Sequence, residues 1–188
     1  MPFNYKQLVL RDLALAQRVG RETYEPYYRQ IWKSGGLDWY MERCFGTETL
    51  SAELQDPNIE YWLAEDEAAQ TIGFLKLLLQ KPIPDHPIKN ALYLEKVYLM
   101  PAFFRKGAGQ HLIEFAKQRA SKLGQAAVWL TVMENGPVWS YELAGFQPTG
   151  VVHWDFELLK ETERGSDDFF NRPRIKKRPT ANGYRAFE

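Results

Sequence analysis

Apolar positions in this chain gather into short runs between polar turns, and the most organised stretch is residues 92–123. Residues 92–99 predict a buried strand, and a glycine-containing turn follows over residues 101–109. Apolar side chains then recur at helical spacing at Leu112, Phe115, Ala116, Ala120 and Leu123. Gly124 stands where a C-terminal cap belongs, so the pattern predicts a strand, a turn and an amphipathic helix.

This strand, turn and helix form a candidate anion site. The backbone N–H groups at a helix start and the positive end of the helix dipole point toward one place. Glycine in the turn, as in the Gly-x-Gly of residues 107–109, lets a phosphate approach the backbone without meeting a side chain. The pattern therefore predicts a phosphate-binding turn.

The other strands are predicted from apolar runs between polar or proline-rich segments. They are residues 4–10, 59–64, 71–79, 126–132 and 146–156, with the start of a last strand at 168–170. The runs 59–64 and 71–79 are joined by the polar turn EDEAAQ and predict a hairpin. Residues 126–132 are expected to lie parallel to residues 92–99, because a helix crosses between the two strands.

Three shorter patterns predict helices. Asp12 is a candidate N-cap for a first helix, and residues 47–54 and 138–144 predict two further short helices. An aromatic-rich stretch broken at Gly35-Gly36 lies between the first two: Tyr24, Tyr27, Tyr28, Trp32, Trp39, Tyr40 and Phe45. Its rings either pack as core and lid or line a pocket that offers π-faces to a cation.

Composition narrows the class of protein. The 188 residues, 45% apolar and 26% charged, suit one globular domain. No apolar run approaches the roughly 20 residues that span a bilayer, and the N-terminus lacks a signal-peptide core, so no membrane partner is expected. Cys44 is the only cysteine, which favours a cytoplasmic location. The three histidines lack metal-ligand spacing, so no metal is expected.

Charge separates a body from a tail. Lysine plus arginine and aspartate plus glutamate both number 24, which predicts no nucleic-acid partner. Residues 171–188 hold six of the basic residues and one of the acidic ones, leaving 18 basic and 23 acidic residues in the body. We therefore expect a single domain over residues 1–170 and a basic, proline-containing arm over residues 171–188. The arm is expected to cross the surface or to contact a second copy in a homodimer, with nucleic-acid binding through its basic residues as the alternative.

The segment VYLMPAFFRKGAGQHL, residues 97–112, resembles the GNAT superfamily of acyl-CoA-dependent N-acetyltransferases. The family pattern there is hydrophobic-x-hydrophobic-x-Pro-x-aromatic-(Arg/Gln)-x-x-Gly-x-Gly, and NGPVWSYELAGF, residues 135–146, resembles a second family element. The finer layout resembles the bacterial spermidine/spermine N-acetyltransferase branch, through YMERCFGTETLSAEL, LEKVYL and a Gly-x-Gly-x-His-Leu helix start.

The resemblance implies an α/β (α+β) fold: a mixed, mostly antiparallel central sheet with a central parallel strand pair and flanking helices. It also implies transfer of an acetyl group from acetyl-CoA to a primary amine, a polyamine in that branch, by direct attack in a ternary complex. The chain departs from the family in two places. Phe104 stands where Arg or Gln is usual, and the segment before Tyr141 is shortened, with Pro137 in place of an alanine.

For the cosubstrate, the resemblance implies two binding segments. The coenzyme A pyrophosphate is expected on the backbone of Arg105, Lys106, Gly107, Ala108, Gly109 and Gln110. Lys106 either adds a cation there or is solvated. Val97, Tyr98 and Leu99 are expected to bind the pantetheine arm through backbone groups, with one N–H near Tyr98 facing the thioester oxygen. Asn135 is the candidate for the family asparagine.

Two residues are candidates for proton transfer. Tyr141 matches the family acid, and a phenol with a pKa of about 10 can protonate a departing thiolate; alternatively its ring packs on the cofactor. Glu95 is the candidate base, because it is an acidic residue in an otherwise apolar strand. Its alternatives are an ion pair with Lys96 or Lys76, or exposure to solvent, and ordered water could also take the proton.

The acceptor is the least defined part. Asp38, Glu42, Asp155 and Glu157 could meet a polycation, or could be ordinary surface charges. A small-molecule amine is the expected partner. The alternatives are a coenzyme A sensor without turnover and an N-acetyltransferase that acts on a protein or peptide amine.

Overall fold

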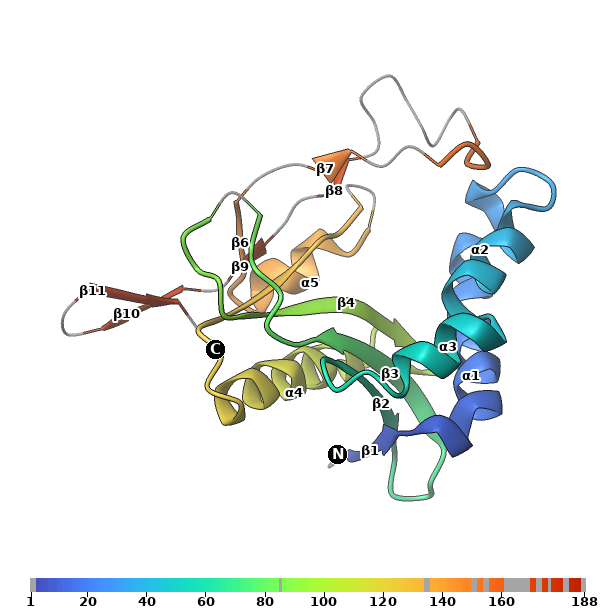
Figure 1. Cartoon of the computed structure of the whole chain (residues 1–188), viewed down its shortest axis with the longest axis horizontal. Helices are drawn as coiled ribbons and strands as arrows, with labels where there is room; N and C mark the ends of the chain where they lie inside the picture. Colours follow the sequence, from blue (N-terminus) through green and yellow to red (C-terminus); the bar gives the residue numbers. More distant parts are fainter. Residues whose placement is uncertain are drawn as a thin grey trace.

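The computed structural model describes residues 3–84, 86–133, 136–149 and 156–160, and the backbone of residues 152–153, 170–171, 174–175, 177–180 and 183–186. A mixed β-sheet with strand order β1-β2-β3-β4-β5-β9-β6 forms its centre, and helices cover both faces (Figure 1). None of the described helices is long and apolar enough to cross a membrane.

The first four strands follow one another in antiparallel order, and a parallel strand comes next. These strands are β1 (Asn4–Leu8), β2 (Ile59–Glu65), β3 (Thr71–Leu78), β4 (Ala91–Leu99) and β5 (Ala127–Leu130). The parallel pairing joins residues 91–93 of β4 to residues 127–129 of β5. The predicted hairpin and the mixed sheet with a central parallel pair are thus confirmed.

The far edge of the sheet is built from short pieces. The run 146–156, predicted as one strand, yields β6 (Gln147–Pro148) and β7 (Val152–His153), and β7 pairs with β8 (Phe170–Asn171). β9 (Arg174–Ile175) lies between β5 and β6 and pairs with both. β10 (Lys177–Thr180) and β11 (Gly183–Ala186) form a hairpin beyond the sheet (Figure 1). The segment expected as an arm therefore supplies one strand of the sheet.

Two groups of helices cover the sheet (Figure 1). On one face lie α1 (Leu13–Tyr28), α2 (Gly36–Phe45) and α3 (Thr47–Glu53), and on the other lies α4 (Ala108–Lys122). α5 (Val138–Leu143) follows β5. The described residues also include three 3₁₀ turns: η1 (Leu10–Asp12), η2 (Arg29–Ile31) and η3 (Pro101–Phe103).

The core has one layer on each side of the sheet. The α4 layer contains the predicted stripe of Leu112, Ala116 and Ala120, all fully buried, and Gly124 adopts the left-handed conformation expected of a C-terminal cap. Leu123, also expected on that stripe, is exposed instead, because the helix ends one residue before it. The α1–α3 layer buries most of the aromatic-rich stretch.

The start of α1 corrects one prediction. The Asp12 side chain makes no capping bond to α1; it accepts hydrogen bonds from the Val9 N–H (3.1 Å) and the Lys6 ammonium (2.7 Å). A 3₁₀ turn over residues 10–12 intervenes between β1 and α1, and Asp12 caps that turn instead. α1 then continues through Pro26, so it absorbs the first part of the aromatic stretch.

Candidate active site

The parallel strands β4 and β5 separate after a short pairing. Their register ends at Tyr93 opposite Trp129, whereas β4 continues to Leu99 with its other edge still paired to β3. From residue 94 onward, the β5-facing edge of β4 therefore has open backbone groups. This opening is the centre of the candidate site.

A β-bulge in β4 lies at the point where the strands part. Lys76 of β3 is opposite Lys96, but the next residue, Leu77, is opposite Leu94. Glu95 is therefore the extra residue of a bulge, which breaks the alternation of side chains along the strand. As a result, the neighbours Glu95 and Lys96 both line one cavity instead of facing opposite sides of the sheet.

One cavity, of about 560 Å³, occupies the opening between β4, the turn before α4, α5 and the end of α1. We call it the cofactor cavity. Nine of the residues proposed to bind the cosubstrate line it: Val97, Tyr98, Leu99, Arg105, Gly107, Ala108, Gly109, Gln110 and Tyr141. Lys106 does not line it, since its ammonium lies over the Phe103 ring, 5.9 Å from the centroid. Asn135 lies outside the described residues.

The turn before α4 has backbone groups available for a ligand. Arg105 and Gly107 both have positive φ, 58° and 81°, so the chain reverses sharply just before the helix begins at Ala108. Within the described residues, the N–H groups of Arg105, Lys106 and Gly107 donate to no other group. Such successive N–H groups beside a helix start form an anion-binding concavity.

The two glycines of the turn differ in what they require. Gly107 needs its left-handed conformation, which residues with a Cβ seldom adopt. Gly109 lies in the first turn of α4, and a Cβ there would come within ordinary contact distance of Leu99, at 3.7 Å. The backbone conformation therefore favours glycine at position 107, whereas position 109 has space for a Cβ.

The register of β3 and β4 identifies which β4 amides face the opening. The Met100 N–H donates to the Ile72 carbonyl on the β3 side, at 2.8 Å. Because N–H directions alternate along a strand, the Tyr98 N–H also faces β3, and those of Val97 and Leu99 face the opening. The sequence predicts that an N–H near Tyr98 faces the thioester oxygen. The N–H groups with the direction required for this role are those of Val97 and Leu99.

α5 is attached to the start of α4 by a side chain. The Gln110 amide donates to the Ser140 carbonyl (2.7 Å) and to the Ser140 hydroxyl (2.8 Å). This contact fixes Tyr141, the next residue, against the cofactor cavity. Burial raises the pKa of the Tyr141 phenol above its ordinary value, and the nearby Tyr28 and Tyr93 add to the effect. Sequence reasoning missed Ser140, because no local pattern marks its partner.

A second cavity, of about 350 Å³, adjoins the first, and we call it the aromatic cavity. The Tyr24 ring stacks on Tyr28 and Tyr40, with centroids 4.5 Å and 4.7 Å away, and its hydroxyl accepts a hydrogen bond from the Trp32 indole at 3.2 Å. All four rings line this cavity. These aromatic residues therefore pack in the core and also line a cavity. The sequence had left these two roles as alternatives, and the same rings fill both.

The charged groups beneath the aromatic cavity form a connected chain. Glu95 Oε1 accepts from Lys96 (2.6 Å) and from Lys76 (3.1 Å), and Lys76 also donates to Glu53 (2.6 Å). Burial alone would raise the pKa of Glu95, but Lys96 and Lys76 outweigh it, and the pKa lies below its ordinary value. Burial would lower the pKa of Lys96, but Glu95 outweighs it and raises that pKa. Glu95 and Lys96 are thus held as ions.

Comparison with known proteins agrees with this geometry. The model of the Acetyltransferase (GNAT) family matches residues 19–143. An uncharacterized N-acetyltransferase in the pepI 3′ region of Lactobacillus delbrueckii subsp. lactis is 25% identical over 130 residues, covering 69% of this chain and 74% of that protein. The D-amino-acid N-acetyltransferase HPA3 of Saccharomyces cerevisiae is 32% identical over 113 residues, covering 57% of this chain and 68% of that protein.

The chain belongs to the acetyltransferase (GNAT) family. Acetyl transfer with acetyl-CoA as cosubstrate, predicted from the sequence, is thereby confirmed as its class of activity. The fold also matches the crystal structure of the PaiA N-acetyltransferase from Thermoplasma acidophilum in complex with coenzyme A, with a TM-score of 0.69 and 23% identity. That likeness covers 95% of this chain and all of the other.

Phe104, the departure from the GNAT pattern, packs within the protein. Its ring lies 4.2 Å from that of Tyr27 at the end of α1, and both rings line the cofactor cavity. The contact joins the turn before α4 to the helix opposite. Where the family pattern has Arg or Gln, this chain therefore has an apolar contact, and Arg105 is the cationic lining residue of the turn.

The other carboxylates considered from the sequence do not line the aromatic cavity. Asp38 pairs with Arg21 at 3.2 Å, and Glu42 and Glu157 are absent from the lining residues. Asp155 lies outside the described residues. Cys44 lines the cavity without a histidine among the described lining residues. No group of metal-ligating side chains occurs in the part of the chain that the structure describes.

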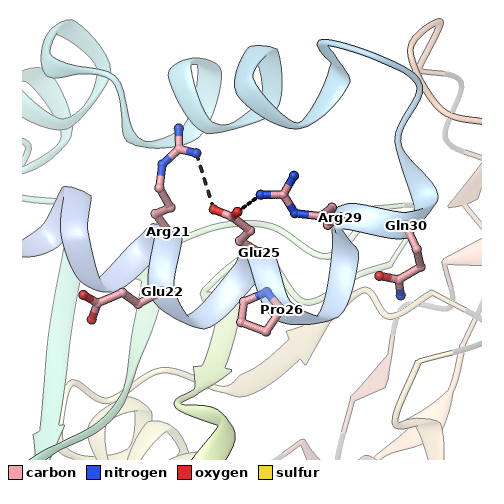
Figure 2. A pocket seen from close by; sticks show the side chains of 6 residues that line it. All are labelled: Arg21, Glu22, Glu25, Pro26, Arg29 and Gln30. Carbon is pink, nitrogen blue, oxygen red and sulfur yellow. Dashed lines mark hydrogen bonds and ion pairs between the residues drawn. The ribbon is translucent and has the colours of Figure 1, made fainter.

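A third hollow, of about 630 Å³, lies on the outer side of α1 and differs in character (Figure 2). Glu25 lies between Arg21 and Arg29 and pairs with both, so the charges of this hollow satisfy one another. Its lining comes from α1 and the following turn, without any residue of β4 or of the turn before α4. We therefore place the candidate active site in the other two cavities.

Proposed function

We propose that this GNAT protein transfers an acetyl group from acetyl-CoA directly to a small primary amine, without an acyl-enzyme. The observation that carries the proposal is the meeting of the two cavities. Val97, Tyr98 and Tyr141 line both of them, so a thioester in the cofactor cavity and an amine in the aromatic cavity would meet beside Tyr141. Positioning two substrates in this way supplies a large part of the catalysis.

The chain's residues fit coenzyme A as the occupant of the first cavity. The unpaired N–H groups of residues 105–107 and the start of α4 suit a pyrophosphate, and Arg105 supplies a cation beside them. The open amides of Val97 and Leu99 suit the amide groups of a pantetheine arm. One of these amides is our candidate donor to the thioester oxygen.

The reaction requires one proton to leave the nitrogen and one to reach the sulfur. The nitrogen–carbon bond forms as the carbon–sulfur bond breaks, so that an amine and acetyl-CoA yield an amide and the free thiol of coenzyme A. Tyr141 is the candidate acid for the thiolate, since its raised pKa keeps the phenol protonated at neutral pH. An acid of high pKa still suits this step, because a strong hydrogen bond to the thiolate stabilises the developing charge.

Glu95 remains the candidate base, with a specific constraint. Its lowered pKa makes the carboxylate a weaker base than an ordinary glutamate. We therefore assign it the first contact with the amine, through Oε2, from which ordered water carries the proton away. Contact of the amine with Oε2 is compatible with the ion pairs to Lys96 and Lys76, because both lysines contact the other oxygen, Oε1.

A panel of amines tests the proposal. We expect release of coenzyme A thiol from acetyl-CoA only when an amine is present, together with an acetylated amine by mass spectrometry. The panel contains spermidine, which the sequence resemblance suggests, an aromatic amine, an amino acid, an aminoglycoside and a peptide. Tight binding of acetyl-CoA without any acetylated product would favour the sensor alternative.

A further inference from the structure

The bulge in β4 presents two opposite charges side by side to the aromatic cavity. Lys96 is 6% exposed and lines the cavity beside Glu95. A lysine ammonium has three N–H donors, and within the described residues the only acceptor recorded for Lys96 is Glu95 Oε1. Up to two donors of a deeply buried cation are therefore available to a ligand.

Only one of the two carboxylate oxygens of Glu95 accepts a hydrogen bond from a described residue. Both of its lysine partners contact Oε1, and no described residue donates to Oε2. The Glu95 side chain is 23% exposed and lines the cavity, so a ligand that supplies an N–H can reach this oxygen. The cavity thus holds one unsatisfied acceptor next to unsatisfied donors.

The described charged residues that line the aromatic cavity leave no excess of negative charge. Glu95 is neutralised by Lys96, and the adjacent Lys76 is neutralised by Glu53. The remaining charged residue among the described lining residues is Arg43, which lies over the Trp39 ring with its guanidinium carbon 5.5 Å from the centroid. The described walls therefore offer no surplus of negative charge to a polycation.

Building on the function proposed above, we infer that the acceptor is a zwitterion: an amine with a carboxylate on a nearby carbon and an apolar or aromatic side chain. Its amine nitrogen donates to Glu95 Oε2 and its carboxylate accepts from Lys96. The rings of Tyr24, Trp32 and Tyr40 supply an apolar wall for its side chain. Amino acids of moderate size have this chemistry, and the volume of about 350 Å³ accommodates them.

Acceptors that share one aromatic side chain and differ in their carboxylate, with spermidine as a polyamine, test the inference. The ratio kcat/KM is measured for L-phenylalanine, D-phenylalanine, phenylalaninamide, 2-phenylethylamine and spermidine. We expect at least one phenylalanine enantiomer to exceed both phenylalaninamide and 2-phenylethylamine by about tenfold or more, as one charge-assisted contact supplies. In K96M that preference should fall to within about threefold. The preference is a ratio of two acceptors measured on the same variant, so a general change in activity caused by the altered pairing of Glu95 cancels from it.

Two variants separate recognition from folding. K96R keeps the cation and should keep the preference, and K122M, at the exposed end of α4, should behave as the wild type. K96M leaves Glu95 paired to Lys76, so its thermal unfolding should remain cooperative. A preference for spermidine or for phenylalaninamide over phenylalanine would overturn the inference, as would a K96M variant with an unchanged preference.

Calorimetry distinguishes this inference from the function on which it rests. If no amine is acetylated, the proposed function fails, and binding of the same ligands to the coenzyme A complex then decides the inference. Phenylalanine must bind more tightly than phenylalaninamide in the wild type and lose that advantage in K96M. Equal binding of the two ligands by the wild type would refute the zwitterion site.

Discussion

The cofactor cavity and the aromatic cavity share part of their lining, including Val97, Tyr98 and Tyr141, but they differ in the groups that they offer a ligand. The first depends on backbone: the positive-φ turn at residues 105–107, the start of α4 and the open amides of β4. The second depends on side chains brought together from α1, α2 and β4. Backbone groups are the same in every sequence with this fold, whereas side chains vary. The proposed donor site therefore depends on the fold, whereas the proposed acceptor site depends on side chains particular to this chain.

Tyr141, one of the residues that line both cavities, gives the largest expected effect. Replacing Tyr141 by Phe removes the candidate acid and keeps the ring, so kcat should fall by about 10²-fold or more while the affinity for acetyl-CoA changes little. Stopped-flow or steady-state release of the thiol measures kcat, and calorimetry measures binding.

The pH dependence of the wild type adds to this test. Since burial raises the pKa of Tyr141, any loss of activity from its ionisation should begin above pH 10, the ordinary value of a phenol. A Y141F variant with full kcat would leave the phenol as packing against the cofactor. It would also remove the link that we draw between the two cavities.

The backbone features of the cofactor cavity could be predicted from the sequence, whereas the side-chain arrangement of the aromatic cavity could not. The turn and α4 were predicted because glycines, helix periodicity and the cap at Gly124 are local signals. The bulge at Glu95 could not be predicted, because it is a property of the register between β3 and β4. Without it, alternation would place Lys96 on the opposite face from Glu95, and the pair in the aromatic cavity would not exist.

Asp12 and Ser140 show the same limit on a smaller scale. Asp12 has the residue type and position of a helix N-cap, but the 3₁₀ turn that intervenes gives its carboxylate other donors. Ser140 meets Gln110 across 30 positions of the chain, a contact that neither residue type announces. The sequence therefore predicts elements and local motifs well, and tertiary pairings of polar side chains poorly.

The ion pairs of Glu95 test the structure of the aromatic cavity. E95Q removes the recorded anionic partner of buried Lys96 among the described residues, so the free energy of unfolding should fall by about 3 kcal/mol. Urea unfolding measures it. The control E22Q removes an exposed pair with Arg18 and should change stability by less than about 0.5 kcal/mol.

The pH dependence of the same variant has a defined sign. The pKa of Glu95 is lowered in the folded protein, so its stabilising contribution is present above the ordinary carboxyl pKa of about 4.3 and is lost as the pH falls through the lower, folded value. The difference in unfolding free energy between wild type and E95Q should therefore shrink on acidification below about pH 4. A difference that stays constant down to pH 2 would contradict the ion pairs around Glu95.

A substitution at Gly109 tests whether coenzyme A binds in the cofactor cavity at the first turn of α4. A Cβ there meets only Leu99 at an ordinary distance, and alanine favours a helix, so G109A should keep or slightly raise the melting temperature. Its methyl group would stand where a phosphate approaches, so the Kd for coenzyme A should rise about tenfold, or ~1.4 kcal/mol. Unchanged affinity in calorimetry would show that the phosphate does not bind at the first turn of α4.

Gly107 offers the smallest effect and the opposite pattern. Its φ of 81° is unfavourable for a residue with a Cβ, so G107A should lower the free energy of unfolding by about 1 kcal/mol, even without any ligand. Chemical denaturation without coenzyme A measures this loss. G107N, whose side chain tolerates the left-handed conformation better, should recover part of it. Equal stability of G107A and wild type would mean that the turn relaxes to another conformation. In that case affinity for coenzyme A should fall instead, because the N–H groups of residues 105–107 would no longer converge.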